Sequence, residues 1–307
     1  MKKVLVATVK PFAPAAVEQI KAVVDAAGYE FELLEKYAEQ SDLVNAVKTA
    51  DAVIIRSDKV TEEVIAGTDT LKIVVRAGAG YDNVDLSAAN SKGIVVMNTP
   101  GQNSNAVAEL AFGMMVYLAR NGYNGKAGTE LKGKNIGIHA FGNVGRYVSE
   151  IAKGFGMNVY AFDPFVSAEA IKEAGVTPLE SVEELYSTCQ YISLHIPAND
   201  KTKKSIDKAL LAKMPKGAVL VNTARKEVIN EEELLQLMAE RTDFAYISDI
   251  APDCADEIAE KFEGRFFFTP KKMGAQTSEA NINAGVAAAE QIRDFFKKGD
   301  TSCQVNK

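Results

Sequence analysis

Residues 135–145 read Asn-Ile-Gly-Ile-His-Ala-Phe-Gly-Asn-Val-Gly, and a helical pattern follows them. An apolar run thus enters a turn of the spacing G-x-G-x-x-G, with Ala140 in the first glycine position. In such a turn the second glycine lets the backbone approach a pyrophosphate, and the third lets the helix pack on the strand. The stretch predicts a dinucleotide-binding turn in which an anion binds at the start of a helix, on Gly142, Asn143, Val144 and Gly145.

Asp163 lies 18 residues beyond Gly145, at the end of the apolar run 159–162. A carboxylate at this spacing accepts hydrogen bonds from the ribose hydroxyls of a bound dinucleotide. The same charge repels a 2′-phosphate, so the pattern favours NAD over NADP. The alternative is a glycine-bearing turn of any strand–helix unit, followed by an incidental aspartate.

The regions on both sides of this turn alternate short β-rich runs with helical stretches. This alternation is typical of parallel α/β units whose sheets are covered on both faces. The spacings from Ser181 to Glu184 and from Asn230 to Glu233 predict capping boxes at two helix starts. The chain divides into two α/β sets near Pro100. We predict strands at 3–8, 51–56, 73–76, 135–139, 158–162, 191–195, 218–222 and 244–250, and helices at 15–27, 60–66 and 106–120.

Composition narrows the class of protein. A length of 307 residues suits two domains, and a net charge of −6 does not favour nucleic acid or anionic membranes as partners. The three cysteines form no C-x-x-C pair, which indicates a reduced cytoplasmic protein without a metal site. The apolar run 4–9 stops at Lys10, so it predicts a first strand rather than an export signal. We expect a cytoplasmic protein that binds small molecules and does not associate with membranes.

Three further stretches suit anions. Arg76 precedes Gly78, Ala79 and Gly80, whose successive amides can form a carboxylate-binding nest. Arg56 and Ser57 end a predicted strand, where a guanidinium beside a hydroxyl suits phosphate or carboxylate oxygens. For the glycine stretch the alternative is a plain turn, and for Arg56 the alternative is a solvated side chain without a ligand. Arg225 follows the strand 218–222, at the sheet edge where α/β proteins bind ligands.

Taken together, these motifs resemble the D-isomer-specific 2-hydroxyacid dehydrogenases over essentially the whole chain. The family fold implied is two Rossmann-like parallel-sheet domains, one flavodoxin-like and one NAD-binding, with a cleft between them. The resemblance implies a substrate-binding domain over 1–99 plus 276–307, an NAD-binding domain over 100–275, and a homodimer. The stretches that carry it are 55–57, 76–85, 98–109, 131–145, 194–197, 221–225 and 269–270.

The resemblance also implies a catalytic arginine, carboxylate and histidine. The arginine corresponds to Arg225. Thr269-Pro-Lys-Lys-Met-Gly274 stands where the family has a Thr-Pro-His-hydrophobic-Gly pattern, and matching back from Gly274 puts Lys272 in the place of the histidine. We expect Lys272 to be the acid/base, with His195 as the alternative base and anion binding as the alternative role of Lys272. Asp253 is the expected carboxylate, with Glu257 as the alternative.

The remaining residues implied are contacts to the two ligands. The substrate would lie against Arg56, Ser57, Arg76, Gly78, Ala79, Gly80 and Asn103. Besides the glycine turn and Asp163, the cofactor would contact His195, Ile196, Pro197, Thr202, Thr223, Ala224 and Asp249.

Within the family the resemblance is strongest to the phosphoglycerate dehydrogenases. It implies a phosphorylated 2-hydroxy acid as substrate, oxidised from 3-phosphoglycerate to 3-phosphohydroxypyruvate in serine biosynthesis, with Arg56, or else Lys271, on the phosphate. The alternatives are a hydroxypyruvate, glyoxylate or D-lactate enzyme and, in another class, an NAD-sensing corepressor. Because the sequence ends at Lys307, directly after a predicted helix at 287–298, we expect no serine feedback through a C-terminal effector domain.

Overall fold

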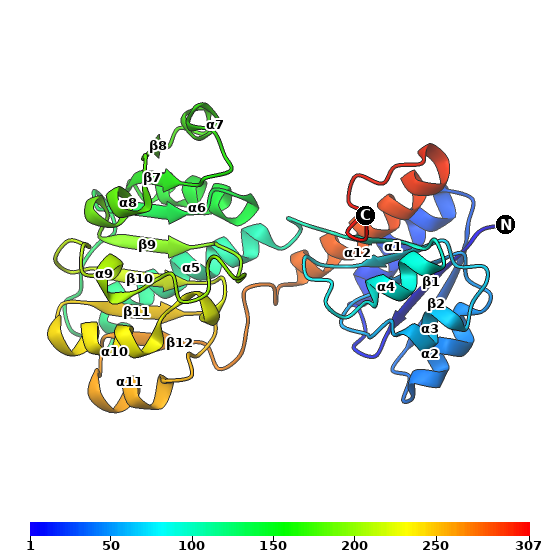
Figure 1. The fold of residues 1–307 in the computed structure, drawn as a ribbon, viewed down its shortest axis with the longest axis horizontal. Helices are drawn as coiled ribbons and strands as arrows, with labels where there is room; N and C mark the ends of the chain where they lie inside the picture. The colour runs from blue at the N-terminus through cyan, green and yellow to red at the C-terminus, as the bar shows by residue number, and fades with distance from the viewer. The chain divides into compact units, whose positions relative to one another are not determined.

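The computed structural model describes residues 1–307, which form two compact units (Figure 1). The first unit comprises Met1–Asn103 and Gln276–Lys307, and the second comprises Ser104–Ala275. The chain passes from the first unit to the second between residues 103 and 104, whereas the sequence predicted this boundary between residues 99 and 100. Thr99 belongs to the first unit in both divisions, and its amide donates to the Gly78 carbonyl at 3.0 Å while its hydroxyl accepts from the Gly78 amide at 2.6 Å.

The first unit is a five-stranded parallel sheet of order β2-β1-β3-β4-β5. Side chains of β1 alternate between two cores: Val4 and Val6 face one, and Leu5 and Ala7 face the other. Helices α1 (Pro14–Ala26) and α12 (Ser278–Lys298) cover the first face, and α2 (Gln40–Val47), α3 (Glu62–Ala66) and α4 (Leu86–Ser91) the second. The strands are β1 (Lys3–Thr8), β2 (Glu30–Glu35), β3 (Ala52–Ile55), β4 (Ile73–Arg76) and β5 (Val95–Asn98).

The second unit is a seven-stranded parallel sheet of order β12-β11-β10-β9-β6-β7-β8. Helices α5 (Ser104–Ala119), α6 (Asn143–Gly154) and α7 (Ala168–Glu173) pack on one face. The other face carries α8 (Val182–Thr188), α9 (Lys208–Leu211), α10 (Glu231–Glu240) and α11 (Ala255–Lys261). The strands are β6 (Asn135–His139), β7 (Asn158–Phe162), β8 (Thr177–Pro178), β9 (Tyr191–Leu194), β10 (Val219–Asn222), β11 (Ala245–Ser248) and β12 (Phe266–Phe268).

Each sheet has one point at which the strand order reverses. In the first unit it lies between β1 and β3, and in the second between β6 and β9. Loops leaving the carboxyl ends of two such strands diverge to opposite faces, which opens a crevice where α/β proteins bind ligands. Arg56 follows β3, and the glycine turn follows β6. Two of the predicted anion-binding stretches therefore lie at the switch points.

The fold class and all eight expected strands are confirmed, but four strands were missed. All four, β2, β5, β8 and β12, are edge strands, and β2 carries three glutamates in six residues, which hides its strand pattern. The capping box at Asn230 is wrong. The Asn230 side chain caps no amide, the Asn230 amide donates to the Ile206 carbonyl at 3.0 Å, and Glu233 Oε2 accepts from the Lys208 amide at 2.8 Å. Ser181 does cap α8, accepting from the Glu184 amide at 3.1 Å.

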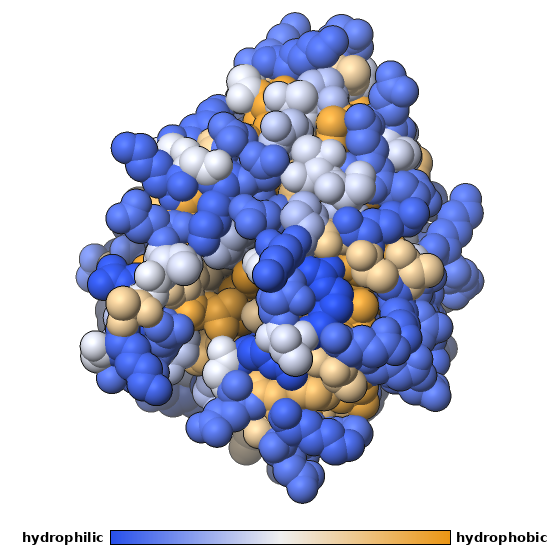
Figure 2. All heavy atoms as spheres, turned by 90° about the vertical axis from the view of Figure 1, so that its left-hand side faces the viewer, coloured by the Kyte–Doolittle hydropathy of each residue, from blue (hydrophilic) through white to orange (hydrophobic).

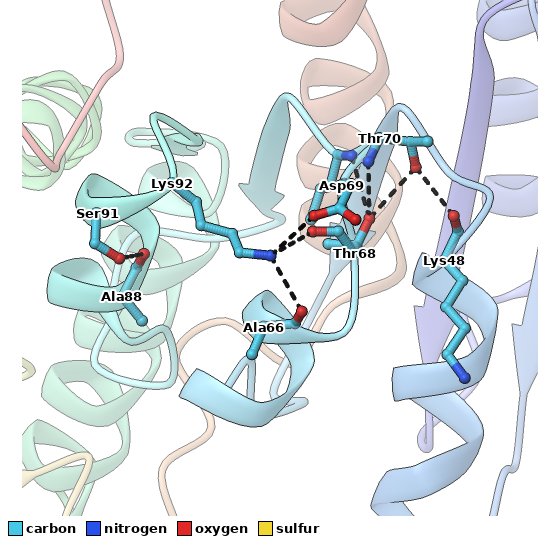
Figure 3. Close-up of polar contacts among 9 residues, drawn as sticks. Lys48, Ala66, Thr68, Asp69, Thr70, Ala88, Ser91 and Lys92 are labelled. Atoms are coloured by element: carbon cyan, nitrogen blue, oxygen red, sulfur yellow. Dashed lines mark hydrogen bonds and ion pairs between the residues drawn. The ribbon is translucent and has the colours of Figure 1, made fainter.

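A lysine holds the loop that follows α3 (Figure 3). Lys92 Nζ donates to the carbonyls of Ala66 at 3.1 Å and Thr68 at 2.7 Å, and pairs with Asp69 Oδ1 at 3.3 Å. A cation at the last carbonyls of a helix complements their partial negative charge. Lys92 directly follows α4, and its side chain therefore connects the end of α3 to the end of α4.

The surface of the second unit in Figure 2 is mostly hydrophilic, and hydrophobic residues show in areas between hydrophilic ones. No helix combines the length and the apolar character needed to cross a bilayer.

The glycine turn itself is under backbone strain. Ala140 adopts φ +82°, a left-handed conformation that favours glycine. Gly145 permits a close approach, since a Cβ there would lie 2.4 Å from the Ala140 carbonyl oxygen. The alanine in the first position of the motif therefore fits the turn only with strain, whereas the third position admits no side chain.

We expect Ala140→Gly to raise the free energy of unfolding by up to about 1 kcal/mol, because glycine removes the left-handed strain and offsets its own entropy cost. Urea denaturation monitored by circular dichroism measures this change. Gly145→Ala is the opposing variant and should destabilise the protein. A loss of stability in Ala140→Gly would contradict this account of the turn.

Candidate functional site

The start of α6 presents free backbone donors. Gly142 precedes the helix, and the amides of Asn143, Val144 and Gly145 make no hydrogen bond within the chain. A Cβ built on Gly142 would meet no atom within 4 Å, so there is open space beside these amides. Free N–H groups at the positive end of a helix, beside an open space, suit a pyrophosphate.

Asp163 lies beside this turn and braces it. Its Oδ2 accepts from the Phe141 amide at 2.8 Å, and its Oδ1 accepts from the Phe165 amide at 2.8 Å. A carboxylate offers about four acceptor positions. Asp163 therefore retains acceptor capacity for ribose hydroxyls while it fixes the backbone between β6 and α6.

The two histidines lie at the ends of adjacent strands, β6 and β9. His139 Nδ1 lies 3.2 Å from the Tyr186 hydroxyl, and His195 Nε2 lies 2.9 Å from the Ser193 hydroxyl. Burial lowers the pKa of His139 to about 4 and that of His195 to about 3. Both rings are therefore neutral at pH 7, and His195 is a poor proton acceptor in this state.

The residues after β9 and β10 lie at the edge of the second sheet where the cofactor is expected to bind. Thr202 Oγ1 donates to the Pro197 carbonyl at 2.5 Å and closes the loop that begins at Ile196. Thr223 Oγ1 is buried and has no hydrogen-bond partner. An unpaired buried hydroxyl is costly unless a ligand satisfies it. This orphan group and the open space at Gly142 both fit a dinucleotide.

Arg225 and Lys272 meet at one atom. Arg225 Nη1 donates to the Ala224 carbonyl at 2.8 Å, and Lys272 Nζ lies 3.4 Å from the same oxygen. Partial burial of the ammonium lowers the pKa of Lys272 and the Arg225 guanidinium lowers it further, while Asp249 and Glu227 act in the opposite direction. Two cations that share one carbonyl oxygen form a compact site for an anionic substrate.

Asn222 is a positioning residue that the sequence analysis missed. Its Oδ1 accepts from the Ala224 amide at 2.9 Å, and its Nδ2 donates to the Arg225 carbonyl at 2.9 Å. It thereby fixes the turn that carries the arginine. An asparagine at a strand end, two residues before a turn amide, is a recognisable signal for such bonding.

The expected carboxylates do not reach Lys272. Asp253 is exposed and pairs with Lys226, and Glu257 pairs with Lys261 one helical turn away at 2.7 Å. Asp253 lines a separate hollow of about 540 Å³, together with Lys226 and Glu227. The carboxylate near Lys272 that makes contact with its segment is Asp249, which accepts from the Met273 amide at 2.7 Å and the Gly274 amide at 2.8 Å.

In the first unit, Arg56 lies at the switch point and is heavily bonded. Its Nη1 donates to the carbonyls of Lys10 at 3.2 Å and Pro11 at 3.1 Å, and its Nη2 donates to Asn281 Oδ1. Burial lowers the pKa of Arg56, although not enough to remove its charge near neutral pH. Ser57 is exposed beside it.

The glycine nest is only partly free. Gly78 has φ +143°, and the Arg76 guanidinium lies so close that a Cβ on Gly78 would be 1.5 Å from its Nη1. The Gly78 amide is satisfied by Thr99, whereas the amides of Ala79 and Gly80 make no hydrogen bond within the chain. Two amides of the expected nest therefore remain for an anion.

Two further results bear on the expected ligands. Asn103 is partly buried at the end of the first unit and makes no side-chain hydrogen bond. No group of three or more His, Cys, Asp or Glu side chains is arranged to hold a metal ion.

Comparisons with known proteins show which family this chain resembles. The model of the family described as "D-isomer specific 2-hydroxyacid dehydrogenase, NAD binding domain" matches residues 106–257. Hydroxypyruvate reductase of Thermotoga maritima is 35% identical over 284 residues, which are 86% of this chain and 90% of that protein. D-3-phosphoglycerate dehydrogenase of Methanocaldococcus jannaschii is 36% identical over 277 residues, 84% of this chain but 52% of that protein.

The chain thus spans about half the length of several curated relatives that it matches. Among solved structures, NAD⁺-bound 3-phosphoglycerate dehydrogenase of Entamoeba histolytica is 49% identical, with a TM-score of 0.84, and the match covers 100% of this chain and 99% of that one. With the glycine turn, the strand-end arginine and the two parallel sheets in place, these likenesses show that the chain belongs to the D-isomer-specific 2-hydroxyacid dehydrogenase family.

Proposed function

We propose that this protein is an NAD-dependent dehydrogenase that oxidises D-3-phosphoglycerate to 3-phosphohydroxypyruvate, a step of serine biosynthesis. The observation that carries the chemistry is the meeting of Arg225 and Lys272 at the Ala224 carbonyl, in the unit that holds the dinucleotide turn. The choice of substrate is supported by the 49% identity to the Entamoeba enzyme over the whole chain.

The cofactor role rests on groups that lack partners of their own. The amides of Asn143, Val144 and Gly145 would hold the pyrophosphate, Asp163 the adenosine ribose, and the Thr223 hydroxyl a polar group of the dinucleotide. His195, Ile196, Pro197, Thr202 and Ala224 would complete the contacts. Bound NAD would supply the hydride acceptor for carbon 2 of the substrate.

The chain's own residues handle charge and the proton. Arg225 would bind the substrate carboxylate and stabilise charge on the reacting oxygen. Lys272 would take the hydroxyl proton as the carbon–oxygen double bond forms, which requires a pKa below that of a free lysine. Partial burial and the Arg225 guanidinium act in that direction. The alternative base, His195, is weakened by its depressed pKa of about 3.

The first unit offers further groups for the carboxylate of the substrate and groups for its phosphate. The free amides of Ala79 and Gly80, beside Arg76, suit a carboxylate. Arg56, with Ser57 beside it, suits the phosphate, and Asn103 would contact the substrate. Lys271 remains the alternative phosphate contact because it is exposed next to Lys272.

A second candidate is reduction of unphosphorylated hydroxypyruvate. It is favoured by the Thermotoga maritima protein named hydroxypyruvate reductase, of which the chain covers 90%. The two candidates differ in the need for a phosphate site, so they are separable by substrate.

A homodimer in the cytoplasm is the proposed assembly and location. Helix α5 is apolar on nearly all sides, yet Tyr117 on it is 37% exposed, as is typical of a helix that another subunit covers. All three cysteines are free, which suits a reducing compartment.

The test of function is NADH oxidation with a panel of keto acids. We expect phosphohydroxypyruvate to give the highest kcat/KM, ahead of hydroxypyruvate, glyoxylate and pyruvate. A preference for unphosphorylated hydroxypyruvate would move the assignment to the second candidate. No turnover with any keto acid, combined with tight NADH binding, would indicate a sensor instead of an enzyme.

The cofactor preference depends on the Asp163 charge. The unmodified enzyme should prefer NAD(H), and Asp163→Ala should erode this preference because it removes both the ribose acceptor and the repulsion of a 2′-phosphate. Asp163→Asn keeps an oxygen for the turn amides but lacks the charge, so it should also admit NADP(H). The ratio of kcat/KM for the two cofactors measures the effect. If the unmodified enzyme has the same kcat/KM with NAD(H) as with NADP(H), Asp163 does not have this role.

Lys272→Ala should lower kcat by about a hundredfold or more, the usual loss when an acid/base group is removed. NADH affinity, measured by fluorescence titration, should stay unchanged. Lys213→Ala is a matched control because Lys213 is an exposed lysine of the same unit. Normal turnover of Lys272→Ala together with an inactive His195→Ala would make His195 the base.

A further inference from the structure

The loop that follows β1 forms most of the surroundings of the Arg56 guanidinium. The carbonyls of Lys10 and Pro11 accept from Arg56 Nη1 at 3.2 and 3.1 Å. The centre of the Phe12 ring lies 4.9 Å from Arg56 Cζ, and this ring is buried, so it offers the cation a fixed aromatic face. The position of the guanidinium therefore depends on where residues 10–12 lie.

Asp58 is a buried carboxylate at the start of this loop. Only 6% of its surface is exposed, although it lies in the connection that follows β3. Its Oδ1 accepts from the Val9 amide at 2.7 Å and from the Tyr37 hydroxyl at 2.9 Å, and its Oδ2 accepts from the Arg56 amide at 3.3 Å. Val9, Tyr37 and Arg56 follow β1, β2 and β3. Asp58 therefore joins the carboxyl ends of three neighbouring strands.

The backbone around Asp58 has other hydrogen bonds that do not involve its carboxylate. Asn83 Nδ2 donates to the carbonyl of Arg56 at 3.2 Å and to that of Asp58 at 2.7 Å. What the carboxylate adds is the connection to Val9, directly before residues 10–12. A buried carboxylate is costly unless its oxygens accept hydrogen bonds, and bonds to a charged acceptor are stronger than those between neutral groups. The Val9 bond is therefore a strong link between the loop and the segment that carries Arg56.

We propose that Asp58 is a positioning residue for Arg56. By holding the Val9 amide it fixes residues 10–12, whose carbonyls and aromatic ring then orient the guanidinium for the substrate phosphate. This inference rests on the proposed function, in which Arg56 binds the phosphate. Asp58 itself does not contact the substrate in this role, and it acts only through the geometry of the loop.

The charge of Asp58 has the opposite effect on a phosphate. Burial lowers the pKa of Arg56, and the smaller effect of the Asp58 charge raises it, so the carboxylate acts on the guanidinium. A negative charge this near to Arg56 also repels a phosphate that binds there. A charge effect alone therefore predicts tighter phosphate binding when Asp58 is made neutral. The positioning role instead predicts weaker binding when its hydrogen bonds are lost.

The first experiment measures NADH oxidation by Asp58→Ala with phosphohydroxypyruvate and with hydroxypyruvate. We expect the KM for phosphohydroxypyruvate to rise about tenfold, which is the lower end of the loss expected for Arg56→Ala when its charge-assisted contact is removed. The loss cannot exceed that of Arg56→Ala, because a positioning residue contributes no more than the contact that it positions. The kcat for both substrates and the KM for hydroxypyruvate should stay unchanged, since hydroxypyruvate has no phosphate.

Two further variants separate geometry from charge. Asp58→Asn keeps an oxygen for Val9 and Tyr37 but has no charge, so it should bind phosphohydroxypyruvate at least as well as the unmodified enzyme. Asp69→Ala is the matched control, because it removes the same charge from a fully exposed side chain of the same unit and should leave both KM values unchanged.

A second measurement keeps the test decisive if Asp58→Ala does not fold. Tyr37→Phe removes one donor to Asp58, leaves the charge in place, and should raise the KM for phosphohydroxypyruvate about threefold, the size of effect of one neutral hydrogen bond. In the Arg56→Ala background, neither Tyr37→Phe nor Asp58→Ala should change this KM further, because residues that act through one contact are not additive.

The outcomes separate this inference from the proposed function. If Asp58→Ala lowers the KM for phosphohydroxypyruvate, as removal of a repelling charge would, the positioning role is wrong. Equal losses with both substrates, or the same loss in the Arg56→Ala background, would show that Asp58 serves only the fold. If Arg56→Ala weakens phosphohydroxypyruvate no more than hydroxypyruvate, the assignment of Arg56 to the phosphate itself fails.

Discussion

The parallel direction of the strands is the constraint on which this protein depends. In a parallel sheet every carboxyl end lies at the same edge, so residues far apart in sequence meet there without any local signal. Asp163, His195, Arg225 and Asp249 each follow or end a strand of the second sheet. The sheet order, with its single reversal between β6 and β9, then opens the crevice beside the glycine turn. The topology therefore brings these residues to one edge of the sheet, where the loops supply both side chains and backbone amides.

This constraint also explains how much of the fold the sequence predicts. A strand buried on both faces reads as a short apolar run, so β6 and β9 were predicted within a residue of their observed ends. Such a run is not required of an edge strand, and β2, with its three glutamates, was missed. The error at Asn230 has another cause. A capping box is predicted from neighbouring residues alone, whereas Glu233 accepts a hydrogen bond from the amide of Lys208, 25 residues away.

The residues of the site also fall into those that the sequence predicts and those that depend on contacts between distant residues. A strand-end position is readable, and Arg225 was predicted from it, whereas Asp249 was predicted through the family resemblance. The direction in which a side chain points one or two residues later is not readable from spacing. Asp253 lies four residues beyond Asp249, yet it is exposed and pairs with Lys226. Asp249 was recognised, but its contacts with residues 269–274 depend on the pairing of β11 with β12, and β12 was among the missed strands. An unrecognised strand thus hides the contacts of a residue that was itself recognised.

Arg56 shows how a structural role and a binding role can coexist in one side chain. Its guanidinium has five N–H donors, and three of them are used by the Lys10 carbonyl, the Pro11 carbonyl and Asn281. The Nε–H and one Nη2 N–H remain, which is enough for one two-point contact with a phosphate. The three internal bonds also restrict the rotamers of the side chain, so less entropy is lost when an anion binds. An arginine held in this way at the β1/β3 switch point is better prepared for phosphate than a solvated one, and its internal hydrogen bonds therefore support its proposed role in binding.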